Sequence, residues 1–214
     1  MISLEPSEKQ IALQEHFRRL AVKRLRPRSI LIDAAKPAGV DPDYRALIAE
    51  ENLNAFLIPE EYGGKSLDWM SLAILFEELG AGCAGFAAVY AQTFHSIAAL
   101  LIGGSEEQKK RFFPLLLPPG GHMASFCVTE EKSGSNTSSF STVFSRKGRS
   151  FLLNGAKEPI INAGQSRFYV LWANEEGARN RAGISAFLIP AGTEGLDFGP
   201  YHDKPGFRAA PTAA

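Results

Sequence analysis

The sequence predicts an α+β chain of two domains, an all-helical domain over residues 1–120 followed by a β domain over residues 121–214. Up to about Leu117 the apolar residues recur at helical spacing. Prolines and glycines at positions 118–121 then interrupt the pattern, because they cannot continue a helix. Beyond them come short runs rich in Val, Ile, Leu, Phe and Tyr, separated by turn residues, which are typical of strands.

Five helices are expected in the first domain, near residues 7–25, 42–52, 68–80, 86–102 and 105–117. The first and last begin with the capping-box pairs Ser7 with Gln10 and Ser105 with Gln108. In such a pair, each side chain satisfies a backbone N–H at the other residue. Asp41, directly before a proline, is typical of an N-cap with proline at the first helical position.

Five strands are expected in the second domain, at His122–Thr129, Ser139–Ser145, Ser150–Asn154, Arg167–Ala173 and Ile184–Ile189. The residues from Arg146 to Arg149 predict a turn between the second and third of them. After Phe198 the chain is rich in proline, and we expect no further strand or helix to close the sheet. An open sheet edge exposes unpaired backbone groups, so this edge is expected to need a cover.

Composition argues against several classes of protein. Lys plus Arg and Asp plus Glu both total 23, and neither half of the chain has the basic excess of a nucleic-acid-binding or membrane-surface protein. Cys83 and Cys127 lie in unrelated local sequence, so reduced, buried thiols are expected. The N-terminus has no signal pattern, and the nearly apolar stretch from Gly80 to Ala91 is too short to span a bilayer. We therefore expect a soluble, cytoplasmic protein without a membrane span.

No catalytic or metal-binding pattern is evident from spacing alone. No histidine lies at metal-ligand spacing from another histidine, a cysteine or a carboxylate in the sequence, so no zinc or iron site is expected. The loop from Lys132 to Asn136 is small, polar and glycine-containing, which suits backbone N–H groups that bind a ligand, but a plain hairpin turn is favoured. Glu130 and Glu131 have two interpretations, a general acid and base or a solvated run of charges, and the solvated run is favoured. The apolar stretch from Phe86 to Leu101 has two interpretations, the wall of an apolar ligand pocket or an ordinary buried helix, and the buried helix is favoured.

Seven segments, taken in order, resemble the acyl-CoA dehydrogenase family along essentially the whole chain. They are Leu57–Gly64 (I-P-E-E-Y-G-G), Phe76–Gly80 (E-E-L), Gly104–Pro114 (G-T-E-E-Q-K), Phe126–Glu130 with Gly134–Ser135 (T-E-P-x-A-G-S), Leu153–Lys157, Gly183–Leu188 (G-I-S-A-F-L) and Asp203–Thr212 (D-K-x-G-x-R). Each match alone is weak. So many in the same order make the resemblance specific.

The resemblance implies a fold and an activity. Members of the family have an N-terminal helical domain, a middle domain that is β-barrel-like or sandwich-like, and a C-terminal four-helix bundle, assembled as dimers or tetramers. They hold FAD between the middle domain and the bundle. A carboxylate removes the α proton of an acyl-CoA thioester while flavin N5 takes the β hydride, and the electrons pass to an electron-transfer flavoprotein.

The resemblance also implies a set of binding residues. Phe126, Val128 and Thr129 match positions that border the flavin, and the Thr129 hydroxyl is expected to donate to its pyrimidine side. Gly134 and Ser135 match positions that contact the flavin and, for Ser135, the pantetheine of CoA. These five residues are the core of the expected cofactor site.

The acyl pocket and two departures complete the expected site. Phe94 and His95 lie on the helix that is expected to form part of the acyl-pocket wall, beside substrate-binding Ser135. Pro159 stands where the family has a tryptophan that packs on the isoalloxazine, and Ile161 replaces a hydroxyl residue that hydrogen-bonds to N5. Losing both contacts is expected to weaken FAD binding by about tens of fold, or to make it depend on a partner.

The chain as given resembles only the N-terminal and middle domains, so we expect it to be a truncated dehydrogenase that lacks the bundle and the catalytic glutamate. No catalytic residue is assigned. We expect an FAD-dependent acyl-CoA dehydrogenase-type chain that is inactive alone and needs a chain carrying the bundle, or a homo- or hetero-oligomer. The alternatives are a non-catalytic partner or scaffold subunit of a complete dehydrogenase, and a degenerate fragment. An oxidase or monooxygenase relative and the acyl length stay open.

Overall fold

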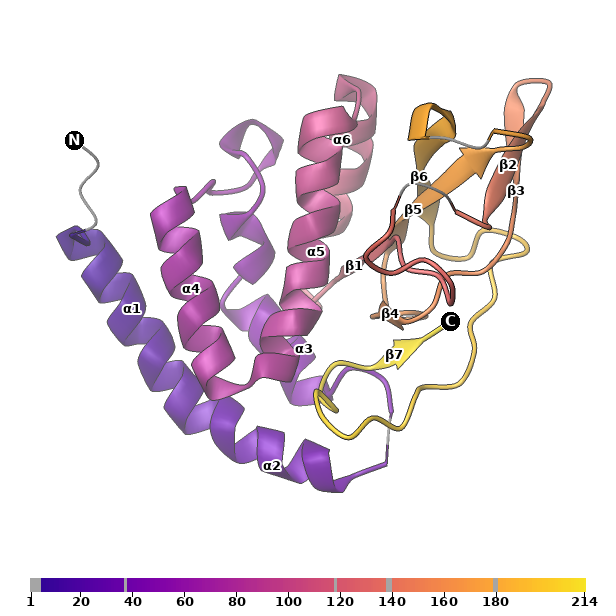
Figure 1. Cartoon of the computed structure of the whole chain (residues 1–214). Helices are drawn as coiled ribbons and strands as arrows, with labels where there is room; N and C mark the ends of the chain where they lie inside the picture. The colour runs from indigo at the N-terminus through magenta and orange to yellow at the C-terminus, as the bar shows by residue number, and fades with distance from the viewer. Residues whose placement is uncertain (1–4, 37, 118, 138–139, 179–180) are drawn as a thin grey trace.

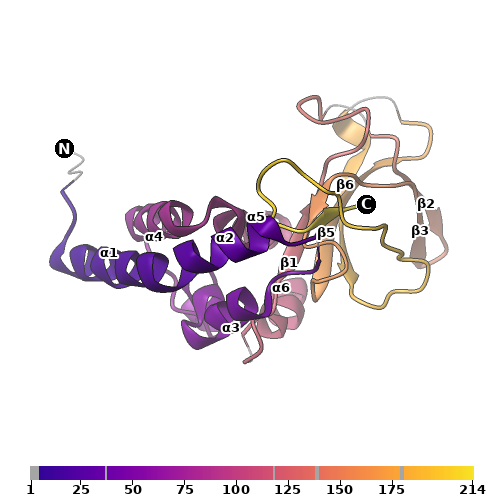
Figure 2. The same cartoon turned by 90° about the horizontal axis from the view of Figure 1, so that it is seen from below.

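The computed structural model describes residues 5–36, 38–117, 119–137, 140–178 and 181–214. Helices gather on one side of the molecule and strands on the other (Figure 1). In the view turned by 90°, α1 and α4 lie away from the strands, whereas α5 lies beside β1 (Figure 2). The order along the chain is therefore helical first and β second, as the sequence predicts.

The described residues of the N-terminal part contain six α-helices: α1 Glu8–Leu20, α2 Arg26–Ala34, α3 Pro42–Glu50, α4 Trp69–Gly82, α5 Ala84–Gly103 and α6 Glu106–Phe112. Both predicted capping boxes are present, and the Asp41 side chain accepts a hydrogen bond from the Asp43 N–H at 3.0 Å. Helix α2 was not predicted from the sequence. A π-helical segment, Ala21–Leu25, joins it to α1, and Pro27 lies in its first turn, where a missing N–H costs little.

Helix α5 is the central helix of this domain. Its Phe86, Val89 and Tyr90 are buried, and the Tyr90 hydroxyl donates to the Leu53 carbonyl at 2.6 Å. By length and composition alone this helix is long and apolar enough to cross a membrane, so the apolar segment of the chain is longer than the predicted stretch from Gly80 to Ala91. One face of the helix is buried in the core, as is also seen in core helices of globular domains.

The β part contains a mixed five-stranded sheet and a small second sheet. Its strands are β1 Ala124–Cys127, β2 Val143–Lys147, β3 Ser150–Asn154, β4 Ile160–Ile161, β5 Phe168–Glu175, β6 Ile184–Pro190 and β7 Thr212–Ala213. Strand β5 is central: β1 and β2 pair with it in parallel, and β6 pairs with it in antiparallel fashion. Strand β3 extends the sheet beyond β2 through the predicted hairpin.

The expectation that no strand follows Phe198 was wrong. Strand β7 pairs antiparallel with β4, with Ile160 opposite Ala213 and Ile161 opposite Thr212. The segment before β7 returns to the helical domain, where Arg208 donates to the Ala35 carbonyl at 2.6 Å. Two-residue strands have no readable alternation, so neither β4 nor β7 gives a sequence signal.

The two parts share a continuous core across their junction, which lies near the predicted boundary; Pro118 itself is outside the described residues. The rings of Phe112 on α6 and Phe168 on β5 meet edge to face at 5.1 Å between centroids. The Asn162 amide donates to the Val89 carbonyl of α5 at 2.9 Å. Any site along this junction is therefore shaped by both domains.

A tight approach of backbone to backbone fixes the start of the β part. Gly121 has a φ of +59°, and a Cβ there would lie 1.9 Å from the Arg45 carbonyl oxygen. We expect Gly121→Ala to lower the free energy of unfolding by more than about 2 kcal/mol, because it adds a steric clash to the left-handed backbone penalty.

The control for this change is Gly148→Ala in the β2–β3 turn, where φ is +62° but no atom lies within 4 Å of an added Cβ. Urea denaturation of both variants measures the difference. Equal losses in the two variants would show that the close approach at Gly121 carries no energy of its own.

Candidate functional site

Two backbone segments carry most of the predicted flavin residues, and the structure places them side by side. The first is the end of β1, residues 126–129, and the second is residues 158–161 leading into β4. The Ser125 hydroxyl donates to the Ile161 carbonyl at 2.9 Å, and the Glu158 N–H donates to the Thr129 carbonyl at 2.9 Å. Residues far apart in sequence thus form one wall; their role in flavin binding stays a prediction.

A line of aromatic rings continues this wall toward helix α5. The Phe126 ring lies 5.9 Å from that of His95 on α5 and 5.9 Å from that of Trp172 on β5, between centroids. Phe94 instead packs against Phe76 at 5.6 Å, inside the helical domain. Of the two predicted acyl-pocket residues, His95 is therefore the one that contacts the predicted flavin wall.

The loop that contains Gly134 and Ser135 is exposed to solvent. It follows a tight turn in which Glu130 and Ser133 exchange two backbone hydrogen bonds of 3.0 Å. A Cβ placed on Gly134 would meet nothing within 4 Å. The described part of the loop is thus compatible with the plain turn that the sequence analysis favoured, and its ligand contacts stay a prediction.

A buried ion pair lies directly behind the wall. The Lys157 Nζ is 2.8 Å from the Glu130 Oε1, and each side chain is only 4% exposed. The same ammonium donates to the Val128 carbonyl at 3.0 Å and lies 3.8 Å from the centre of the Phe140 ring. The expectation that Glu130 belongs to a solvated charge run was wrong: of the two carboxylates only Glu131 is exposed, because it lies at the tip of the turn that Glu130 and Ser133 close.

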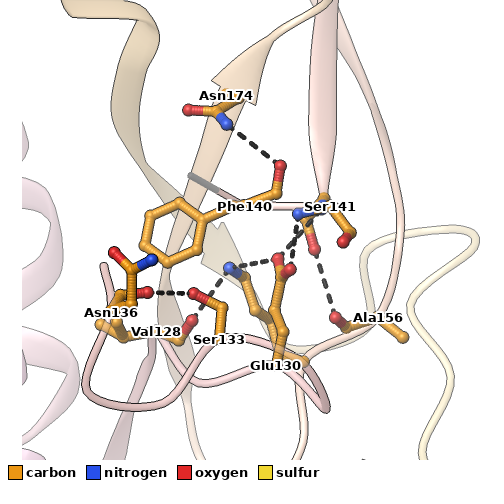
Figure 3. A network of polar contacts seen from close by, with 10 residues as sticks. Val128, Glu130, Ser133, Asn136, Phe140, Ser141, Ala156 and Asn174 are labelled. Carbon is orange, nitrogen blue, oxygen red and sulfur yellow. Dashed lines mark hydrogen bonds and ion pairs between the residues drawn. The ribbon is translucent and has the colours of Figure 1, made fainter. Parts of the chain in front are cut away.

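Backbone groups complete the network around the Glu130 carboxylate (Figure 3). The N–H groups of Ser141 and Thr142 donate to its two oxygens, the second at 2.9 Å. Burial raises the pKa of this carboxyl, but hydrogen bonds from Lys157, Thr142 and Ser141 outweigh burial and bring the pKa of Glu130 down to about 2. Burial also lowers the pKa of Lys157, while Glu130 opposes that shift. The pair is thus held ionised near neutral pH.

The network extends to two further segments. The Thr142 hydroxyl donates to the Ala156 carbonyl at 3.2 Å, and the Asn174 amide donates to the Phe140 carbonyl at 3.0 Å. Figure 3 shows Asn174, Phe140 and Ala156 around the carboxylate of Glu130. This hydrogen-bond network therefore joins four segments: the end of β1, the start of β2, the β3–β4 connection and β5.

The residues present fit a flat heteroaromatic cofactor. Phe126 and Trp172 place two aromatic rings in edge-to-face contact on the wall, and the indole N–H of Trp172 is buried without an acceptor in the part of the chain that the structure describes. Such a donor suits a ligand with acceptor atoms. Pro159 is exposed and Ile161 is half-buried, and by residue type neither adds an aromatic ring or a hydroxyl.

The opposite side of the sheet carries a different cavity. It has a volume of about 450 Å³, and its walls include Cys127, Ile160, Tyr169 and Leu171. Burial raises the pKa of the Cys127 thiol to about 12, so the thiol is protonated at neutral pH. Among the described residues, no group of three or more His, Cys, Asp and Glu side chains is arranged to hold a metal ion.

Comparison with known proteins identifies the family. Residues 7–118 match the N-terminal domain of acyl-CoA dehydrogenases, and residues 125–214 match their middle domain. The chain belongs to the acyl-CoA dehydrogenase family. The resemblance read from the sequence motifs is thereby confirmed, together with a helical N-terminal domain that precedes a mixed-sheet domain.

Two curated relatives show how much of a family member the chain spans. Cyclohex-1-ene-1-carbonyl-CoA dehydrogenase of Syntrophus aciditrophicus is 31% identical over 98% of this chain and 50% of its own length. The mitochondrial short-chain specific acyl-CoA dehydrogenase of Rattus norvegicus is 32% identical over 99% of this chain and 51% of its own length. The chain spans about half the length of the relatives that it matches.

Solved structures agree with this assignment. A chain in the structure of the electron transferring flavoprotein of Acidaminococcus fermentans has 28% identity and a TM-score of 0.87, over 99% of this chain and 55% of the other. An acyl-CoA dehydrogenase of Bacillus anthracis, complexed with FAD, has 25% identity and a TM-score of 0.85, over 100% of this chain and 36% of the other. The family uses FAD, as the sequence motifs imply.

The buried pair gives a first prediction for this site. Glu130→Gln removes the negative charge but keeps the shape, and leaves the Lys157 ammonium buried without a counter-charge. We expect the free energy of unfolding to fall by about 3 to 5 kcal/mol, as for other broken buried pairs. The exposed neighbour provides the control: Glu131→Gln should change it by less than about 0.5 kcal/mol. A small loss for both variants would contradict the role given to the pair.

The pH dependence of stability gives a second prediction. The folded-state pKa of Glu130 is about 2, below the ordinary value of 4.5, so its contribution is complete above pH 4.5 and is lost as the pH falls toward 2. We expect the stability difference between the wild type and Glu130→Gln to shrink across this window, as measured by denaturation at each pH. A constant difference would show that ionisation of Glu130 is not what stabilises the site.

Proposed function

We propose that this chain forms the cofactor- and acyl-binding half of an FAD-dependent oxidoreductase of the acyl-CoA dehydrogenase type. The observation that carries the proposal is the placement of residues 126–129 beside residues 158–161, along the junction with α5. Family membership over both domains supports it, as does the FAD complex of the B. anthracis relative. When bound, FAD accepts the hydride from the substrate.

Each part of the wall has a proposed task. Phe126 and Val128 provide apolar contact with the flavin, and the Thr129 hydroxyl donates to its pyrimidine side. Gly134 and Ser135 bind the flavin and the pantetheine arm of CoA from the exposed loop. On α5, His95 borders the acyl group, next to the Phe126 ring.

The α proton needs a base from outside these residues. The carboxylate of Glu130 is held ionised in the buried pair, with a pKa of about 2, and is a poor proton acceptor at neutral pH. The Glu158 Oε1 lies 2.8 Å from the Nε2 of His202, so this carboxylate already has a partner. We propose that the base comes from the half of a family member that this chain does not span, in the same protein or in a partner.

The remaining partners follow from the same proposal. The substrate is an acyl-CoA thioester, the electrons leave to an electron-transfer flavoprotein, and the assembly is a homo- or hetero-oligomer in the cytoplasm. Pro159 and Ile161 provide neither an aromatic ring nor a hydroxyl group. They therefore favour weakened or partner-dependent FAD binding.

A second candidate function rests on those same two positions. A non-catalytic subunit or scaffold of a complete dehydrogenase tolerates their change without loss of function. Co-purification with an intact family member distinguishes it: a stable complex whose activity is unchanged by Thr129→Val favours the scaffold, whereas flavin retention by this chain favours the enzyme. A degenerate fragment, the third candidate, would not unfold cooperatively in a thermal scan.

The proposed cofactor site gives a further prediction. We expect the purified chain, incubated with FAD and desalted, to retain flavin absorbance, alone or with a chain that carries the C-terminal domain. Thr129→Val should then lower FAD affinity by about three- to tenfold, because one hydrogen bond to the ligand is lost.

The matched control is Thr193→Val, an exposed threonine in the turn after β6. It should leave FAD affinity unchanged. No retained flavin in either arrangement would overturn the proposed function, and equal affinities of the two variants would remove Thr129 from the site.

A further inference from the structure

Strand β5 presents one row of side chains to the helical domain. Phe168, Val170 and Trp172 share a face of the sheet, because alternate residues of a strand point the same way. Phe168 and Val170 are fully buried in the core that the two domains share. Trp172, one position further along this face, is only half-buried. It therefore lies where the sheet emerges from beneath the helices.

The indole of Trp172 belongs to the predicted flavin wall by position. Its ring lies 5.9 Å from that of Phe126 at an interplanar angle of 68°, and Phe126 in turn contacts His95. The opposing residue on β6 is Ala186, whose small side chain leaves the ring uncrowded on that strand. Two predicted ligand residues and Trp172 thus line one stretch of the domain junction.

The polar atom of this ring has no hydrogen-bond partner among the described residues. Within the described ranges, the Trp172 Nε1 is buried and finds no hydrogen-bond acceptor. Buried tryptophan N–H groups are ordinarily paired, because an unpaired donor keeps the cost of losing water. An unpaired donor beside an aromatic wall suits a ligand with acceptor atoms.

We propose that Trp172 is a flavin-binding residue: its indole packs beside the isoalloxazine ring next to Phe126, and its N–H donates to an acceptor atom of the flavin. This inference rests on the proposed function. It assigns the aromatic contact with the flavin to β5, whereas positions 159 and 161 of this chain carry no aromatic side chain.

The chain has two tryptophans, which makes a direct test available. Trp69, on α4, is 74% exposed and packs against Phe94 rather than the predicted wall. Trp69→Phe leaves Trp172 as the sole tryptophan fluorophore, and Trp172→Phe leaves Trp69. FAD titrated into each flavin-free protein should quench the Trp69→Phe variant more strongly, because a ligand in ring contact with Trp172 quenches its emission.

Affinity provides a second readout with the same variants. We expect Trp172→Leu to weaken FAD binding by about tenfold or more, and Trp172→Phe, which keeps a ring but loses the N–H, by about three- to tenfold. Trp69→Phe is the matched control and should bind as the wild type does. Thermal unfolding of each variant checks that the fold is kept, and Trp172→Phe retains most of the buried ring if Trp172→Leu fails to fold.

The outcomes separate this inference from the proposed function. If the wild type binds FAD and both Trp172 variants bind it equally well, the inference is overturned and the proposed function stands. If the wild type binds no FAD alone or with a chain carrying the C-terminal domain, both are overturned. Quenching of Trp172 by butyryl-CoA without FAD, and not by FAD, would also overturn the inference, since the ring would then contact the substrate.

Discussion

The arrangement of the candidate site depends on the buried ion pair between Glu130 and Lys157. A charge taken from water is costly, and an ion pair repays that cost only when its geometry is good and its remaining groups are hydrogen-bonded. Here Lys157 also reaches the Val128 carbonyl, and backbone N–H groups of Ser141 and Thr142 reach Glu130. The pair therefore acts mainly by specifying geometry: it holds the end of β1 against the connection that leads into β4.

The position of these two segments also depends on helix α5, which packs against them from the helical domain. The Thr93 hydroxyl accepts a hydrogen bond from the Ala124 N–H at 3.2 Å, which ties the start of β1 to the middle of α5. One turn before it along the helix, the Val89 carbonyl accepts from Asn162, directly after β4. Helix α5 thus fixes the positions of both segments of the wall along its axis. The aromatic rings from His95 through Phe126 to Trp172 span the space between this helix and the sheet. Neither domain builds the site alone.

Local chemistry explains which elements the sequence predicts. Ser7 and Ser105 mark helix starts because a capping box is complete within four residues, and the β2–β3 hairpin follows from its glycine turn. Strands β4 and β7 are defined only by each other, and the burial of Glu130 depends on Lys157, which lies far along the chain. Such partners are fixed by tertiary contacts. The family motifs locate the wall, but Trp172 lies outside every motif, and only the fold brings it to Phe126.

The carboxylates of the site also indicate how the work is divided. A general base needs a pKa near the working pH, and burial beside apolar groups is the usual way to raise it. Glu130 is buried, yet its three donors stabilise the charged form so strongly that the shift goes the other way. A residue whose ionisation holds the wall together cannot accept a proton without loosening that wall. Accepting a proton and holding the two segments of the wall together are therefore incompatible tasks for Glu130.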